Sequence, residues 1–207
     1  MRKIVSLLLA LVMVLSVSCA SAIDVGGAIG DVLNNLLNQN TTSPEESITG
    51  LMSAVKTIYD KEEIPYTPME GYEDSCLVTV MELTDSRLGD MYLYSDCYED
   101  SLLLTTYYDE VADPAVFDEM IKLFNYVNGD LFWGKLYLLE ESGDMCYEVC
   151  LPMNGAALTD QDKVNISEFA FTCMYVCDLM VEYISAVMNG ETGANAFAMY
   201  VADIYAE

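Results

Sequence analysis

Hydrophobic residues recur at helical spacing in the last quarter of the chain. From Ile166 to Val187 they lie three or four positions apart, and polar residues occupy the opposite side. The apolar positions are Ile166, Ala170, Cys173, Cys177, Met180, Ile184 and Val187, and the polar ones are Asn165, Glu168, Thr172, Asp178, Glu182 and Asn189. The pattern predicts a long helix, capped by Thr159 and ended at Asn189-Gly190, with one face buried against a sheet.

Capping residues followed by apolar faces predict two earlier helices. Ser43-Pro44-Glu45-Glu46 is a capping box with proline at the first helical position, and Pro65 and Pro68 end any continuation. Asp113 and Pro114 predict a second start, and Gly129 is expected to end that helix in the left-handed conformation. The apolar faces consist of Ile48, Leu51, Met52, Val55, Ile58 and Tyr59 in the first helix and of Val116, Phe117, Met120, Ile121, Phe124 and Val127 in the second.

Five segments between these helices read as strands, namely residues 76–83, 91–95, 101–108, 131–139 and 145–151. Their hairpin-length connections predict antiparallel pairing. Both alternating sets of the first segment are largely apolar, which predicts that it is covered on both faces or lies centrally. The order is helix, three strands, helix, hairpin, helix, and it predicts an α+β domain with helices packed on one face of a five-stranded sheet.

The N-terminus has the three parts of a secretory signal. Arg2 and Lys3 precede an apolar run over residues 4–17, and Ala20-Ser21-Ala22 offers a cleavage site before Ile23. We therefore expect a secreted bacterial protein, with lipid attachment at Cys19 and a cell-surface lipoprotein as the alternative. The expected organisation is a signal peptide at 1–22, a flexible segment at 23–42, the α+β domain at 43–189, and a tail at 190–207 that includes a short helix.

Acidic residues far outnumber basic ones. The chain has 34 Asp and Glu against 8 Lys and Arg, and a net charge of −26. Such a field repels phosphate backbones and anionic lipid, so nucleic acid is excluded as a partner and a membrane is expected only if Cys19 is lipidated. The charge favours a basic polypeptide as partner. The alternative is that the acids only keep the protein soluble.

The absence of histidine removes the commonest general base and imidazole zinc ligands. Ser53 and Lys56 have the spacing of a serine nucleophile with a lysine base, but the companion motifs of penicillin-recognising enzymes are missing. Acidic pairs are unavoidable at this composition, so a carboxylate-dependent hydrolase stays open. No catalytic, cofactor or metal residue is assigned.

Six cysteines follow the predicted leader: Cys76, Cys97, Cys146, Cys150, Cys173 and Cys177. Cys173 and Cys177 lie one turn apart on the last helix, and Cys146 and Cys150 share one face of the last strand. If helix and strand pack together, the four sulfurs could converge, which would allow a disulfide pair or a thiolate metal site. The alternative is small buried hydrophobic residues, which free cysteine resembles.

The central region resembles the YbjN family, whose members are described as bacterial sensory transduction regulators. The segments that carry the resemblance are Phe124-Asn125-Tyr126-Val127-Asn128, Phe132-Trp133-Gly134-Lys135-Leu136-Tyr137-Leu138, Leu151-Pro152-Met153-Asn154-Gly155 and Leu158-Thr159. The resemblance implies a type III secretion chaperone-like fold and brings no catalytic residues. Most members act inside the cell, so the leader is a departure. Asn125 and Asn128 are expected to be structural, because Asn at a helix end bonds local backbone.

These observations predict a non-catalytic exported module that binds proteins or acts like a chaperone. The predicted binding surface is the sheet face or a groove beside the last helix, and the 15 tyrosines, among them Tyr94, Tyr98, Tyr107 and Tyr108, suit a protein-contact surface or ordinary strands. A homodimer is an open alternative, as is a small extracellular carboxylate-dependent hydrolase.

Overall fold

Six antiparallel strands form one sheet in the computed structural model, which describes residues 43–153 and 157–205. The spatial order is β1-β2-β3-β4-β6-β5, so the last hairpin adds its second strand, β6, to the meander and leaves β5 at the edge. The strands are β1 (Thr67–Pro68), β2 (Cys76–Glu82), β3 (Asp90–Cys97), β4 (Ser101–Tyr108), β5 (Lys135–Leu139) and β6 (Asp144–Pro152).

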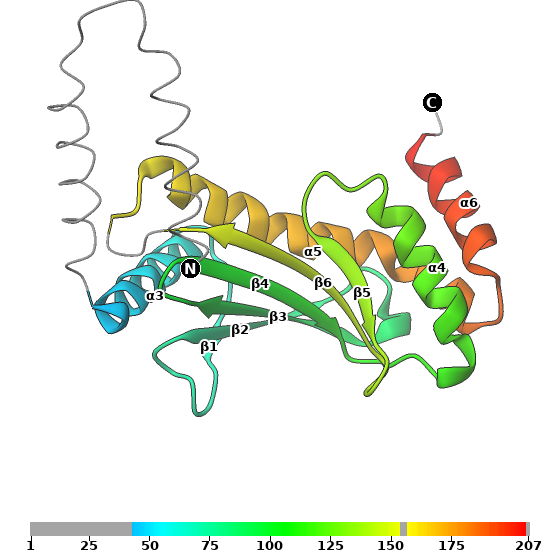
Figure 1. Cartoon of the computed structure of the whole chain (residues 1–207), viewed down its shortest axis with the longest axis horizontal. Helices are drawn as coiled ribbons and strands as arrows, with labels where there is room; N and C mark the ends of the chain where they lie inside the picture. The colour runs from blue at the N-terminus through cyan, green and yellow to red at the C-terminus, as the bar shows by residue number, and fades with distance from the viewer. Residues whose placement is uncertain (1–42, 154–156, 206–207) are drawn as a thin grey trace, which may run out of the picture. The chain divides into compact units, whose positions relative to one another are not determined.

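The described helices lie behind this sheet and beyond its β5 edge in the view of Figure 1. They are α3 (Pro44–Lys61), α4 (Phe117–Asn128), α5 (Asp160–Met188) and α6 (Gly193–Ile204), with single 3-10 turns at Ser86–Leu88 and Pro114–Val116. The longest, α5, crosses β3, β4 and β6, α3 packs beside α5, and α4 packs against β5 and α6. The domain is therefore α+β, with helices packed on one antiparallel sheet.

The helix α5 has the predicted buried face. Every apolar position of the predicted stripe is buried, and both Cys173 and Cys177 have no exposed surface. The hydroxyl of Tyr108 on β4 donates to the Cys177 carbonyl at 2.8 Å, and the Cys177 sulfur lies 2.8 Å from the Thr106 hydroxyl. By length and composition α5 could also cross a membrane, but here it is the core helix of the domain.

The predicted helix starts are confirmed. The Ser43 side chain accepts from the Glu46 amide and the Glu46 carboxylate accepts from the Ser43 amide, which is the predicted capping box. Thr159 and Asp162 form the same motif at the start of α5. Asp113 caps a 3-10 turn at Pro114–Val116, and α4 follows directly from it.

Several predicted details are wrong. The sheet has six strands, because Thr67 and Pro68 pair with Val78 and Leu77 as a short edge strand. Of the two alternatives predicted for β2, coverage on both faces is excluded because Val80 is 49% exposed, whereas the interior position holds, since β2 pairs with β1 on one side and β3 on the other. Gly129 has φ −69° and stays right-handed, so the left-handed glycine expected there is absent.

The strand predicted over residues 131–139 begins only at Lys135. Residues Leu131 to Gly134 form a loop, and Gly134 has φ +69°. The hydroxyl of Tyr147 donates to the Trp133 carbonyl at 2.7 Å and fixes this loop over the sheet. Local propensity indicated a strand here, but the loop is needed to bring the chain from α4 to the sheet edge.

The tail contains the expected short helix, α6. Its first residue Gly193 donates its backbone N–H to Glu119 of α4 at 2.8 Å, and the Phe197 ring stacks on Tyr126 with centroids 5.2 Å apart. The described residues from Ser43 onward form one compact unit. The predicted leader, Cys19 and the segment 23–42 lie outside the described residues, as do Asn154 and Gly155 of the Leu-Pro turn.

Candidate functional site

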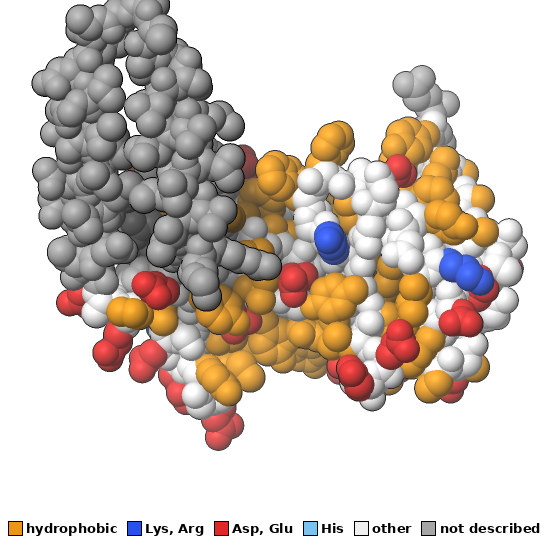
Figure 2. Space-filling view, in the orientation of Figure 1, with side chains coloured by type: hydrophobic (Ala, Val, Ile, Leu, Met, Phe, Trp, Pro, Cys, Tyr) orange, Lys and Arg blue, Asp and Glu red, His pale blue; other side chains and the backbone are white. Residues whose placement is uncertain are grey.

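The sheet face that points away from the helices is the candidate site. Strand pairing places the side chains of Val78, Tyr94, Thr105 and Glu148 in one row across four strands of this face. Among the described residues, no helix lies over it (Figure 1). Figure 2 shows hydrophobic side chains gathered across its middle, with Asp and Glu side chains around them. The other side chains of this face include Val80, Tyr92, Asp96, Leu103, Tyr107, Tyr137, Leu139, Asp144, Cys146 and Cys150.

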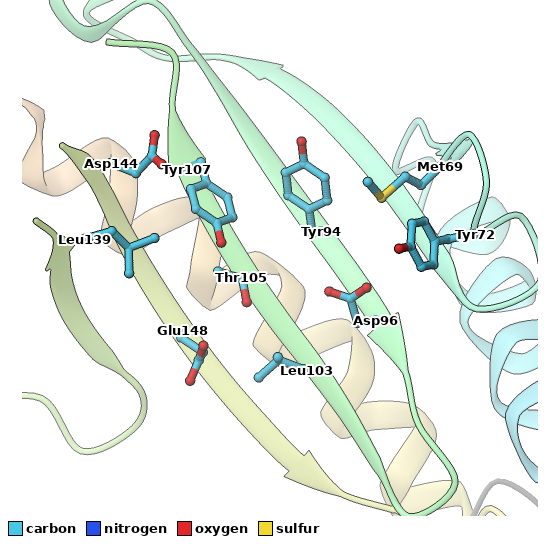
Figure 3. Close-up of a pocket in the computed structure, with 10 residues that line it drawn as sticks. All are labelled: Met69, Tyr72, Tyr94, Asp96, Leu103, Thr105, Tyr107, Leu139, Asp144 and Glu148. Carbon is cyan, nitrogen blue, oxygen red and sulfur yellow. The ribbon is translucent and has the colours of Figure 1, made fainter. Parts of the chain in front are cut away.

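An open groove of about 670 Å³ runs across this face. Side chains of β3, β4 and β6 form its floor, and Met69 and Tyr72, from the turn after β1, stand at one side (Figure 3). Leu139 and Asp144, from the β5–β6 hairpin, stand at the opposite side. The Met69 N–H donates to the Cys76 carbonyl at 3.0 Å, which ties the first wall to the sheet.

Thr105 makes the centre of the groove deep because it is the small side chain among larger ones. It is directly opposite Tyr94 on one side and Glu148 on the other, and Tyr107 is the next residue on its own strand that faces the groove. The Tyr94 and Tyr107 rings meet edge to face, with centroids 5.4 Å apart and an interplanar angle of 89°. Thr105 is only 4% exposed, so a ligand there would contact mainly the surrounding rings and carboxylates.

The groove is acidic. Its described lining includes the carboxylates of Asp96, Asp144 and Glu148 and no Lys or Arg. The nearest basic residue is Lys135, whose backbone lies opposite Glu148 in the β5–β6 ladder. Its side chain is exposed and takes part in none of the ion pairs found among the described residues. The Tyr137 hydroxyl donates to Glu148 Oε2 at 3.1 Å. The result is a negative concave surface with aromatic walls.

The phenols of Tyr107 and Tyr137 on this surface stay neutral near pH 7, because the pKa of each is raised. Burial, followed by the nearby thiol and carboxylates, raises the pKa of Tyr107 to about 12. The same causes, burial first, raise the pKa of Tyr137 above its ordinary value. A neutral phenol ring presents a negative π face and a hydroxyl that donates or accepts a hydrogen bond. Such rings suit a cation, or a ligand with both polar and apolar groups, better than an anion.

The carboxylates of the groove are spread out. Asp96 and Glu148 lie two strands apart and two residues out of register, which places their Cα atoms roughly 12 Å apart at ordinary sheet spacings. Asp144 and Glu148 are four residues apart on one strand, or roughly 14 Å. Glycoside hydrolysis needs carboxyl groups within about 5–10 Å of each other, a separation that backbone positions this far apart reach only if both side chains lean toward one another. The spacing suits several contacts with an elongated ligand better than one reaction centre.

The four cysteines that the sequence places as pairs do not converge. Cys173 and Cys177 lie in the core between α5 and the sheet, whereas Cys146 and Cys150 point from β6 to the opposite face. Side chains alternate along a strand, so the whole sheet separates the two pairs. All six cysteines among the described residues are free thiols, and no group of three or more Cys, Asp or Glu side chains there is placed to hold a metal ion. The hypothesis of four converging sulfurs is therefore wrong. Cys173 and Cys177 are small buried residues with free thiols, as the alternative interpretation expected.

The remaining candidates divide between surface and core. Ser53 is exposed on α3 and lies outside the groove, as does Lys56. Asn125 is exposed, while the Asn128 side chain bonds the Leu136 backbone, which confirms its structural role. Tyr94 and Tyr107 line the groove, but Tyr98 is half exposed outside it and Tyr108 is in the core.

Sequence reasoning missed Thr105, Asp96, Asp144 and Glu148 as neighbours. Their strands were predicted, but the placement of β6 beside β4 is a tertiary result. No model of a known protein family matches this chain, and no curated protein matches it either. The resemblance to the YbjN family and the chaperone-like fold therefore stay predictions.

Proposed function

We propose that this protein is an exported, non-catalytic module that binds a polypeptide on the uncovered face of its sheet. The observation that carries the proposal is a groove of about 670 Å³ on a sheet face that the described helices leave open. Two rings and two aliphatic side chains of that groove, namely those of Tyr94, Tyr107, Leu103 and Leu139, are only partly buried. Aromatic side chains beside polar ones are typical of protein-contact surfaces.

The charge of the groove favours a different chain over a second copy. In a two-fold dimer the same patch of both subunits meets itself. Asp96, Asp144 and Glu148 of one copy would then face the same three carboxylates of the other, with no groove-lining cation among the described residues to compensate. Homodimerisation remains testable by sedimentation, and we expect the isolated protein to be a monomer.

The alternative function is a carboxylate-dependent hydrolase acting at the same groove. Its support is that three carboxylates line one groove. The wide backbone spacing and the open shape favour binding instead, since catalysis requires reacting groups held within a few ångströms of one site.

Peptide panning tests the proposal. The exported chain is used to select binders from a displayed library of random decapeptides. The affinity of each selected peptide is then measured for the wild type and for two variants. Leu103→Lys places a long side chain in the groove, and Phe171→Lys makes the same change on the outer side of α5, where Phe171 is 45% exposed. Both variants must first show the wild-type melting transition.

We expect the selected peptides to bind the wild type and Phe171→Lys equally and to lose at least about tenfold in affinity for Leu103→Lys, because a blocked central contact typically costs 1.4 kcal/mol or more. Selection of no peptide, or equal binding by all three proteins, would overturn the proposal. Monomeric behaviour in sedimentation would agree with it, and a dimer disrupted by Leu103→Lys would show that a second copy occupies the face.

A further inference from the structure

We propose that the groove recognises an arginine side chain of the bound polypeptide, with its guanidinium group lying over Thr105. This inference rests on the proposed function and adds which side chain of the bound polypeptide the groove recognises. Tyr94 and Glu148 are both directly opposite Thr105, so their backbones are roughly 10 Å apart with only the Thr105 side chain between them. A side chain that enters from solvent meets a ring on one side and a carboxylate on the other.

Charge complementarity identifies the ligand as a cation. Of the ten described residues that line the groove, three are carboxylates and none is basic. Among residues 43–153 and 157–205 these three carboxylates make no ion pair, since the ion pairs found there involve Glu62, Asp85, Glu119 and Asp160. A bound cation would therefore gain carboxylate partners without breaking an existing ion pair. The overall charge of −26 assists its approach.

The aromatic side chains favour guanidinium over ammonium. A guanidinium group is planar, so it can stack on a tyrosine ring while its N–H groups donate to a carboxylate. The groove offers the Tyr94 and Tyr107 rings, held edge to face, beside Glu148, whose Oε2 already accepts from Tyr137 and is thereby fixed in position. A lysine ammonium is a compact point charge that would use the carboxylates but gain less from the rings.

Depth adds a third argument. Thr105 is more than nine-tenths buried, and its side chain faces the groove. A guanidinium N–H can donate to the Thr105 hydroxyl oxygen while another donates to Glu148. Asp96, one strand away and diagonal to Thr105, adds a second negative charge near the same point.

The test uses a series of blocked heptapeptides with alternating Thr and Val and one varied central residue. The central residue is arginine, citrulline, lysine or norleucine, and citrulline keeps the shape of arginine without its charge. Binding is measured by NMR titration of the exported chain, up to about 1 mM peptide. The variants are Glu148→Gln, Tyr94→Leu and Asp118→Asn, the last removing the same charge from an exposed site on α4 outside the groove.

We expect the arginine peptide to bind about tenfold more tightly than the citrulline peptide and measurably more tightly than the lysine peptide. Glu148→Gln should remove most of the preference for arginine over citrulline, and Tyr94→Leu most of that for arginine over lysine, while Asp118→Asn should change neither. Gln can still accept from the Tyr137 hydroxyl, so Glu148→Gln is expected to fold normally.

Other outcomes separate this inference from the proposed function. Equal binding of the arginine and citrulline peptides, with both weakened by Leu103→Lys, would leave polypeptide binding intact and overturn cation recognition. Equal binding of arginine and lysine, or a preference unaffected by Glu148→Gln and Tyr94→Leu, would overturn the assignment of guanidinium to this groove. Binding of no heptapeptide, when panning has selected groove-dependent decapeptides, would likewise overturn the arginine assignment alone.

Discussion

The side chain of Asn128 pairs with the backbone of Leu136 in both directions. Asn128 Nδ2 donates to the Leu136 carbonyl and the Leu136 N–H donates to Asn128 Oδ1, each at 2.8 Å. Leu136 lies on β5, which is the edge strand of the sheet. An exposed strand edge offers unpaired N–H and C=O groups to other chains, and the amide of Asn128 occupies one such pair. The end of α4 thereby fixes the position of β5 and protects its edge.

This pairing predicts the effect of Asn128→Ala. Two half-buried backbone groups of Leu136 lose their partner, so we expect the free energy of unfolding to fall by about 1–3 kcal/mol. Urea denaturation followed by circular dichroism measures it. Asn125→Ala is the matched control, since Asn125 is exposed on the same helix and should cost less than about 0.5 kcal/mol. Equal effects of the two substitutions would contradict the role given to Asn128.

Gly134 and Gly71 form a second matched pair. Both have positive φ, +69° and +82°, but a Cβ at Gly134 would lie 2.6 Å from the Tyr147 ring, whereas nothing lies within 4 Å at Gly71. Gly71→Ala should cost only the left-handed strain of about 1 kcal/mol. Gly134→Ala should cost at least about 2 kcal/mol more, because the Tyr147 ring and the Glu148 carbonyl must move. Thermal unfolding of both variants measures the difference, and similar melting temperatures would contradict it.

The cysteines should differ sharply in reactivity. Cys150 is exposed on β6, while the other five described cysteines are buried. Burial, the largest cause, raises the pKa of Cys97 and of Cys146 to about 12, and a thiol reacts through its thiolate. In the native protein near pH 8 we expect iodoacetamide to modify Cys150 first, with the buried thiols reacting only in denaturant. Mass spectrometry of peptides identifies the modified sites. Rapid native modification of Cys146 would contradict the buried environment.

Stability should decline in alkali. Burial raises the pKa of Cys97 from 9.0 to about 12 and that of Tyr107 from 10.0 to about 12. Because the folded pKa exceeds the unfolded one, these groups contribute their full stabilisation below about pH 9, and it is lost as the pH rises toward 12. We expect the urea midpoint to be constant from about pH 7 to 8.5 and to fall by roughly 1 M near pH 11.

Two controls separate this linkage from general charge repulsion in the acidic chain. Cys97→Ala should reduce the alkaline loss, because it removes one group that ionises only after unfolding. Added salt, which screens repulsion between exposed charges, should restore only part of the stability. An unchanged midpoint up to about pH 11 would contradict the burial of these groups.

Local signals in the sequence were sufficient for the helix starts and for most of the strands. Ser43, Asp113 and Thr159 each cap their own chain segment through atoms two or three residues away, so nothing distant is needed to read them. The α5 stripe was equally readable, because its spacing reports which side of the helix avoids water. The same local logic failed at Gly129, which stays right-handed, and at Leu131 to Gly134, where the Tyr147 hydroxyl of β6 holds the loop.

The candidate site needed tertiary information. Both alternating sets of β2, and in part those of β4 and β6, contain hydrophobic residues, so the sequence pattern did not say which face the helices cover. The packing of the helices on one face of the sheet placed Cys177 on that side and Cys146 on the other. It left Tyr94, Thr105 and Glu148 side by side on the open face. The sequence by itself determined the α+β composition, the buried face of α5 and the acidic charge. Only the packing of β6 against β4 created the groove, because its row of side chains comes from strands far apart in the chain.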